Sequence, residues 1–142
     1  MSTSNTEIVV RGYHVDLYGH VNNTRYLEFL EEARWQFAEG HLDLGKWQEQ
    51  GIGFSIVNIN INYRRPAFMG DILQIRTHLS KLGKTSGTIH HEIVHKGTED
   101  VVTDADVTFV MVDAEKNKPV PIKGELRETF ERLGSLGKSS AD

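Results

Sequence analysis

The chain of 142 residues contains no cysteine. This absence excludes a disulfide framework, a thiol nucleophile and a thiolate metal site. An excess of basic residues is missing too, since 16 lysines and arginines stand against 20 acidic residues, giving a formal net charge of −4. Such a chain has no global positive field that attracts nucleic acid or an anionic membrane. Nucleic acid is therefore not an expected partner.

Long apolar runs are also absent. The longest ones fall far short of the roughly 20 residues that a membrane-spanning helix needs, so no membrane span is expected. Residues 1–7 have neither a basic start nor an apolar stretch, which predicts that they are not a signal peptide. Because export and disulfides are both unexpected, the predicted location is cytoplasmic.

What the chain does contain is the composition of a globular protein, with 38% hydrophobic and 25% charged residues. Its length predicts a single domain over residues 1–142. Only the ends are expected to be loose: residues 1–6 are small and polar, and residues 135–142 read as a frayed tail.

One long apolar helix is predicted between Asn22, which offers N-cap chemistry, and Gly40, which is suited to end it. Its apolar stripe recurs at helical spacing in Tyr26, Leu30, Ala33 and Phe37. Further aromatic residues widen the stripe around the helix. A helix that is apolar around much of its circumference is usually wrapped by other structure.

Strands surround this helix in the sequence. A short β-branched run at residues 8–13 comes before it, and a short helix over 43–50 follows it. Then Val57, Ile59, Ile61 and Tyr63 alternate with asparagines, which predicts a strand with one apolar face. Three more strands are predicted at about 70–79, 88–95 and 101–112, before a last helix over roughly 122–133. Consecutive strands favour an antiparallel α+β fold, and about five strands curled around the long helix make a hotdog fold.

Residues 11–26 contain the pattern Asp-x-x-x-His-Val-Asn-Asn-x-x-Tyr, which is fairly specific. This stretch resembles the hotdog acyl-CoA thioesterases of the hydroxybenzoyl-CoA thioesterase superfamily. Further matches at residues 58–66, 70–71 and 124–128 are most similar to the bacterial thioesterase III group, long-chain acyl-CoA thioesterases linked to fatty-acid β-oxidation. The resemblance implies a dimer, commonly assembled into tetramers, with active sites at the dimer interface and no metal or bound cofactor.

Asp16 is the candidate catalytic carboxylate, since it lies in an irregular polar segment directly before the long helix. The first N–H groups of a helix lack intrahelical partners and lie at the positive end of its dipole. The Asn23 N–H is such a donor, suited to hold a thioester oxygen, and the resemblance implies these same two roles. The alternative is that Asp16 only caps the turn. Whether Asp16 attacks the thioester or activates water stays open.

Two further residues of this segment are candidates. His20 is suited to orient Asp16, to hydrogen-bond a water or to assist the leaving thiolate; the alternative is a histidine that holds the turn. Tyr26 is expected to face the sheet, either as plain core or as a wall of an acyl tunnel, and the core interpretation is favoured.

Coenzyme A brings phosphates, which lysine and arginine both bind. Lys84 and Ser86, in a basic turn, and Arg65, before a proline, are the candidate contacts. A solvated basic turn is the alternative for the first two. No glycine-rich phosphate loop accompanies them, which argues against nucleotide-driven chemistry.

The segment from His91 to His95 matches the His-Glu-x-x-His signature of zinc proteases. That chemistry needs a helix, where residues i and i+4 meet on one face. The surrounding β-branched residues predict a strand, on which the two histidines would lie about 13 Å apart, at about 3.3 Å per residue. The sequence therefore predicts no metal site.

Taken together, these features predict an acyl-CoA thioesterase acting on medium- to long-chain substrates. A hotdog hydratase or dehydratase and a non-catalytic acyl-CoA binding module are the alternatives. The hydratase chemistry commonly uses a histidine with a helix carboxylate, and Glu28, Glu31 and Glu32 are predicted on the helix. A solvated face with ion pairs is the favoured interpretation of these glutamates.

Overall fold

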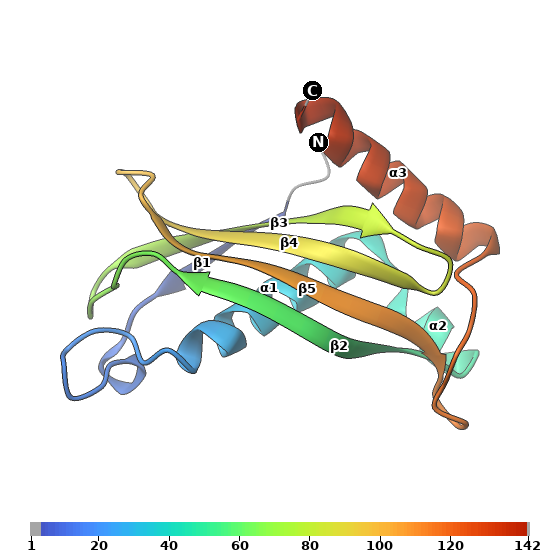
Figure 1. Ribbon diagram of the computed structural model, residues 1–142, viewed down its shortest axis with the longest axis horizontal. Helices are drawn as coiled ribbons and strands as arrows, with labels where there is room; N and C mark the ends of the chain where they lie inside the picture. Colours follow the sequence, from blue (N-terminus) through green and yellow to red (C-terminus); the bar gives the residue numbers. More distant parts are fainter. Residues whose placement is uncertain (1–3, 142) are drawn as a thin grey trace.

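A curled antiparallel sheet wraps around one long helix in the computed structural model, which describes residues 4–141 and their side chains through Gly134 (Figure 1). The elements in chain order are β1 (Ser4–Val9), the 3₁₀ turn η1 (Gly12–His14), α1 (Arg25–His41), α2 (Leu44–Glu49), β2 (Ile52–Tyr63), β3 (Ile72–Leu82), β4 (Ser86–His95), β5 (Val101–Asp113), β6 (Lys118–Pro119) and α3 (Gly124–Ala141). The strand order is β1-β3-β4-β5-β2, with β6 beside β5. The predicted α+β hotdog architecture is confirmed.

The chain ends carry regular structure close to both termini. Strand β1 begins at Ser4 and helix α3 continues to Ala141, so these elements include much of the two segments for which loose tails are expected. Residues 1–3 and 142 lie outside the described residues. No helix in the described part of the chain is long and apolar enough to cross a membrane.

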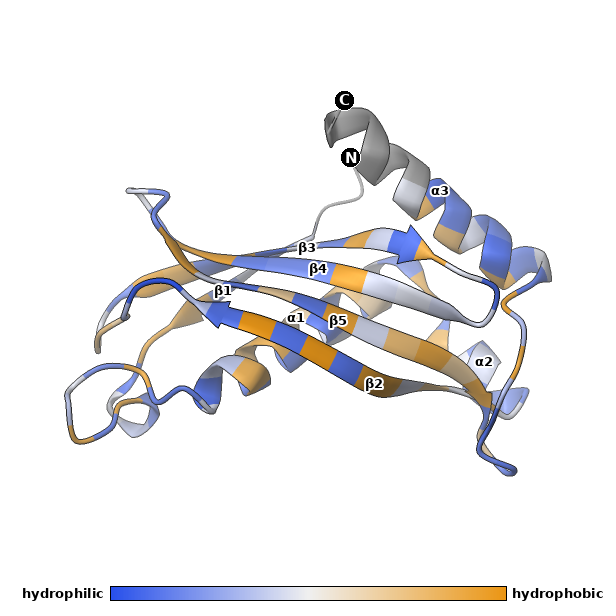
Figure 2. Ribbon diagram, in the orientation of Figure 1, coloured by the Kyte–Doolittle hydropathy of each residue, from blue (hydrophilic) through white to orange (hydrophobic). Residues whose placement is uncertain are grey.

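Strand β2 is longer than the alternation pattern predicts. It begins at Ile52, and a β-bulge at Val57 shifts its register with β5 between Ile56 and Asn58. A bulge places two residues opposite one, so Val57 is not part of the alternation and Ile56 takes its place on the face toward α1. Figure 2 shows the alternating hydropathy along this strand.

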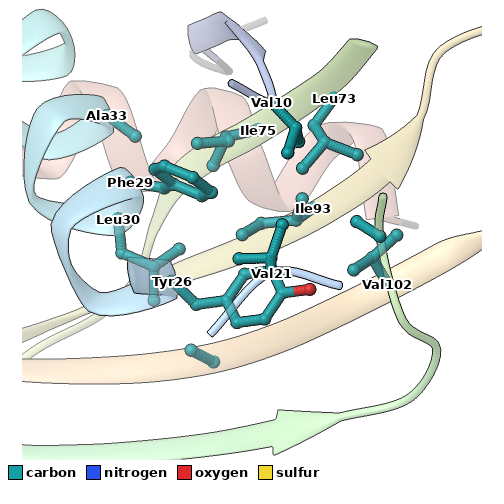
Figure 3. Packing of buried hydrophobic residues seen from close by; sticks show 12 residues of the cluster. Val10, Val21, Tyr26, Phe29, Leu30, Ala33, Leu73, Ile75, Ile93 and Val102 are labelled. Carbon is teal, nitrogen blue, oxygen red and sulfur yellow. The ribbon is translucent and has the colours of Figure 1, made fainter. Parts of the chain in front are cut away.

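The predicted stripe of α1 faces the sheet. Tyr26, Leu30, Ala33 and Phe37 are all at most 3% exposed. Figure 3 shows Leu30 and its neighbours directed toward β3 and β4 residues such as Ile93. Burying each large apolar side chain stabilises the fold by about 1.5–3 kcal/mol, which fixes α1 on the sheet.

A second apolar cluster surrounds the C-terminal half of α1. It joins Phe37 to residues of β3, β5 and α3, among them Phe109 and Phe130. Helix α3 therefore closes one end of the curled sheet, while the start of α1 lies at the other end (Figure 1).

Candidate active site

The polar segment before α1 folds into a tight loop. Val15 and Val21 form an isolated bridge, and the Asp16 N–H donates to the His20 carbonyl at 3.1 Å. This loop is fastened to the one that follows β2, because the Val21 N–H donates to the Ala67 carbonyl at 2.8 Å. The backbone around Asp16 is therefore held on both sides.

Helix α1 begins later than the sequence predicts. Its N-cap is Thr24, so the prediction that Asn22 caps the helix is wrong. Asn22 instead stabilises the turn before it: its Oδ1 accepts from the Thr24 N–H at 3.0 Å and from the Thr24 hydroxyl at 2.8 Å. A side-chain bond to the N–H two residues on is the type that an N-cap residue makes, but here it closes the turn that leads into the helix.

Asn23 lies in the turn that leads into α1. Its N–H makes no hydrogen bond within residues 4–141, although the amides on either side of it do. An amide at the start of a helix that lacks a partner is a ready donor for an oxygen atom of a ligand. The N–H that is predicted to hold the thioester oxygen is therefore unpartnered among the described residues, and it belongs to the residue directly before the N-cap Thr24.

These two loops enclose a groove of about 450 Å³. Its walls are Asp16, Tyr18, His20, Val21, Asn23, Tyr26, Tyr63, Arg64, Arg65 and Pro66. Five of the seven residues predicted for the site therefore meet here. The half-buried Asp16 lies on this groove together with Asn23, as the proposed chemistry requires.

Tyr63 borders the groove although the sequence pattern did not predict it as a site residue. Its hydroxyl donates to the Asn23 carbonyl at 3.2 Å, and its ring lies 5.6 Å from that of Tyr26. Tyr63 is also the last residue of β2, so it links the sheet to the turn that carries the free Asn23 amide. In the sequence Tyr63 is a tyrosine at the end of an alternating strand. That position is more typical of sheet packing than of a functional site, so the pattern offered no reason to include it.

Tyr26 belongs to the core, as the favoured interpretation predicts, and its role as a wall of an acyl tunnel stays a prediction. It is only 3% exposed, yet it borders the groove. Burial raises the pKa of Tyr26 to about 12, and a hydrogen bond with the Ala67 backbone opposes this. The phenol is therefore protonated at neutral pH.

The His20 side chain lies at the rim of the groove. Its ring stacks on Tyr18 with centroids 6.1 Å apart and meets the edge of Phe68 at the same separation. Its backbone bridges to Phe68. His20 therefore holds the loop, as one interpretation predicts, and it also faces the groove, as the other requires.

The phosphate-contact candidates separate into two groups. Arg65 borders the groove, and its guanidinium donates only to the Val101 carbonyl, at 3.4 Å, among the described residues. Its neighbour Arg64 is paired with Asp104 at 2.8 Å. Lys84 and Ser86 belong to the β3–β4 turn at the opposite end of the sheet (Figure 1), so one protomer does not bring them to Asp16.

The helix glutamates are exposed and engaged along the helix itself. Glu28 pairs with Arg25 at 2.9 Å, and the other two accept from Trp35 and Gln36 one turn further on. The predicted solvated face is confirmed. None of these carboxylates borders the groove of the same protomer.

His91 lies on strand β4, as predicted, and is fully buried. Its Nδ1 is 2.9 Å from the Thr77 hydroxyl, and its Nε2 is 3.3 Å from Arg34 Nη1. Arginine only donates, so Nε2 accepts and Nδ1 carries the proton. Burial, with Arg34 next in importance, lowers the pKa of His91 to about 3. His95 instead lies 3.4 Å from Asp71, so the two histidines of the zinc-like pattern have separate partners.

Comparisons with known proteins show the family of the chain. Residues 10–130 match the family described as the thioesterase-like superfamily. The chain is 49% identical over 129 residues to the long-chain acyl-CoA thioesterase FadM of Escherichia coli, a match that spans 90% of this chain and 97% of the relative.

Solved structures show the same fold. The crystal structure of YbaW, a probable thioesterase from Escherichia coli, superimposes with a TM-score of 0.84 at 47% identity, over 91% of this chain and 97% of that one. A DHNA-CoA thioesterase from Staphylococcus aureus superimposes with a TM-score of 0.86 over 97% of this chain and 95% of that one. Because the two sequences are only 19% identical, this similarity shows the fold alone.

Proposed function

The chain belongs to the thioesterase-like superfamily, and from this premise we propose that it hydrolyses long-chain acyl-CoA to a free fatty acid and coenzyme A. The observation that carries the proposal is the groove at the start of α1, whose walls include both Asp16 and Asn23, the residue whose N–H makes no hydrogen bond within residues 4–141. The name of the relative with 49% identity supports the substrate class. The proposed reaction uses no metal or bound cofactor.

In this mechanism the thioester oxygen accepts a hydrogen bond from the Asn23 N–H. Losing one donor of this kind typically costs about 2.7–4 kcal/mol of activation free energy. Water attacks the carbonyl carbon while Asp16 takes its proton; the C–S bond then breaks, and the proton passes to the thiolate. In the alternative route Asp16 itself attacks, and water hydrolyses the mixed anhydride. A thiol ionises near pH 8.5, so either route needs little acid assistance.

His20 and Tyr63 support this chemistry from the walls of the groove. His20 is suited to hydrogen-bond the attacking water or the leaving thiolate, since its ring lies at the rim. Tyr63 acts as a positioning residue, because its hydroxyl fixes the carbonyl of Asn23. The amide that holds the substrate oxygen is thereby tied to the end of β2.

Arg65 is the proposed contact for the coenzyme A phosphates. It borders the groove and keeps donors that no described residue occupies, whereas Arg64 is neutralised by Asp104. Lys84 and Ser86 lie at the far end of the sheet from the Asp16 groove of the same protomer. They would contact bound coenzyme A only if they belong to a second copy of the chain.

A second copy is the proposed partner, docked along the open edge of β2. This outer strand has twelve residues, and an outer strand presents unpaired N–H and C=O groups that pair with another chain. Four of its large side chains are at least 38% exposed: Ile56, Val57, Ile59 and Tyr63. Pairing of two β2 strands satisfies the unpaired backbone groups of this edge and gives a dimer, from which a tetramer is built. Light scattering that finds only monomers contradicts this.

A thiol-release assay on saturated acyl-CoA substrates of increasing length tests the proposed function. The expected result is release of free thiol, fastest for long chains. A parallel assay with an enoyl-CoA separates the alternatives. A hydratase adds water to the double bond and releases no thiol from the saturated substrate, and a binding module holds acyl-CoA without release; either result contradicts the proposal.

A further inference from the structure

A second, almost entirely apolar cavity of about 140 Å³ lies beside the C-terminal half of α1. Four phenylalanines line it, one each from α1, β2, β5 and α3: Phe37, Phe54, Phe109 and Phe130. A water molecule takes up about 30 Å³ in the liquid, and a methylene group is of similar size. The cavity therefore holds about four or five methylene groups.

An apolar strip along β2 connects the Asp16 groove with this cavity. Tyr63 at one end borders the groove, and Ile56 at the other end borders the cavity. Ile59 and Ile61 lie between them on the same face, because all four residues pair with alternate buried positions of β5. The strip is thus continuous from one opening to the other.

The separation of the two sites matches a long acyl chain. The start of α1 at Arg25 and Arg34, which lines the cavity, are nine residues apart, or about 13.5 Å at a rise of about 1.5 Å per residue. A saturated chain advances about 1.25 Å per carbon, given a C–C bond of about 1.52 Å and an angle of about 111°. About 11 carbons therefore span this stretch, and the next four or five fill the cavity.

Phe109 occupies its place in the cavity wall only because residue 87 is glycine. A Cβ atom at Gly87 would lie 2.5 Å from Cζ of the Phe109 ring, well inside van der Waals contact. The ring is held on its other sides by Phe54 and Phe130, with centroids 5.5 and 5.8 Å away. Any side chain at position 87 must displace the ring from this position.

We propose that this cavity receives the far end of the acyl chain, and that Phe109, seated against Gly87, determines the longest chain that the enzyme accepts. Phe130, on α3, forms part of the same wall, against which the end of the acyl chain would rest. The inference rests on the proposed function and adds the residues that set its specificity. It gives α3 a role in substrate selection as well as in closing the core.

Variants that change the cavity in opposite directions test this inference by thiol release across acyl-CoA lengths. Phe109→Ala enlarges the cavity and should therefore favour chains a few carbons longer than the best wild-type substrate. The kcat/KM for such chains, relative to that substrate, should rise about tenfold or more, because one methylene group in an apolar pocket changes the rate about 10–200-fold. Gly87→Ala should shift the preference toward shorter chains by a similar factor.

Met111→Ala is the matched control. Met111 is buried on the same strand and face as Phe109 but does not line the cavity, so it should lower stability without changing the chain-length profile. Should Phe109→Ala fail to fold, the milder Phe130→Leu enlarges the same cavity. If folded cavity variants keep the wild-type chain-length profile, the inference is overturned while the proposed function stands. The same holds if Met111→Ala shifts that profile as much as the cavity variants do. Wild-type protein that releases no thiol at any length overturns the proposed function with it.

Discussion

The Asp16 carboxylate accepts a hydrogen bond from the Tyr18 N–H, with Oδ1 and N 2.9 Å apart. This is the turn-capping contact that the sequence offers as the alternative to catalysis. The same half-buried side chain borders the groove with Asn23, so the capping contact is compatible with the proposed catalytic role. One carboxylate oxygen orients the group on the loop, and the second lies outside this bond.

We expect Asp16→Asn to lower kcat/KM for long-chain acyl-CoA by about 10²–10⁴-fold, the usual contribution of a general base. The asparagine Oδ1 still accepts from the Tyr18 N–H, so the loop, the melting temperature and the oligomer size should stay close to wild type. Thiol release, circular dichroism and light scattering measure the three quantities.

Asp16→Ala removes the cap as well as the charge, and it should lose about 1 kcal/mol of stability in addition to activity. The difference between the alanine and asparagine variants isolates the structural role. Near-normal turnover in the folded asparagine variant contradicts a catalytic Asp16.

Arg65→Ala should raise KM for acyl-CoA by roughly tenfold, about 1.4 kcal/mol, with a smaller effect on kcat, because a phosphate contact remote from the carbonyl binds ground and transition states alike. An acyl-pantetheine substrate, which lacks the nucleotide phosphates, should show no such increase. Steady-state kinetics on both substrates makes the comparison.

Lys84→Ala is the control for this prediction. In a single protomer Lys84 lies at the far end of the sheet, so an effect equal to that of Arg65→Ala would show that a second copy brings Lys84 to the groove. An unchanged KM in Arg65→Ala contradicts the assignment of Arg65.

The buried His91 makes stability depend on pH. Its pKa is lowered from 6.5 to about 3, chiefly by burial, so between these values the unfolded chain binds more protons than the folded one. The free energy of unfolding therefore falls as the pH drops through this window, by roughly 1 kcal/mol per pH unit, and His91 has no such effect above it. Urea denaturation at several pH values measures the slope.

His91→Gln should flatten that slope, since a glutamine amide still accepts from Arg34 and donates to Thr77 but does not titrate. His41→Gln, which removes an exposed histidine of α1, should leave the slope close to wild type. A slope unaffected by His91→Gln contradicts the buried neutral histidine.

Thr103→Val should raise the free energy of unfolding by about 1 kcal/mol. Thr103 is fully buried, and its hydroxyl is the only buried side-chain polar atom without a partner among the residues whose side chains are described. Leaving such a group unpaired costs about 1–3 kcal/mol, and valine removes it. Thermal or urea denaturation detects the change.

Thr77→Val provides the opposite case. Thr77 is equally buried, but its hydroxyl is bonded to His91, so valine leaves the His91 Nδ1–H without an acceptor and should destabilise the protein. Equal effects of the two substitutions contradict the distinction between partnered and unpartnered hydroxyls.

Local patterns in the sequence were sufficient to predict α1 and the strands. The stripe from Tyr26 to Phe37 and the alternation from Ile59 to Tyr63 reflect periodic burial, which any sheet-wrapped helix and half-buried strand must show. The same patterns misplaced two details. The β-bulge at Val57 interrupts the alternation, and Asn22, a good cap by type, makes its side-chain bonds in the turn before α1.

The motif located Asp16, His20 and Asn23 because they lie within eight consecutive residues, and short-range order is visible in a sequence. The contact of Tyr63 with Asn23 spans forty residues, and the seating of Phe109 against Gly87 depends on the pairing of β4 with β5. Residue types and their periodicity thus determined which elements form, and the motif singled out Asp16 as the candidate catalytic carboxylate. Only the tertiary structure, in which the sheet curls around α1, decided which distant residues face one another. Contacts between distant segments arise from tertiary packing and leave no local pattern in the sequence.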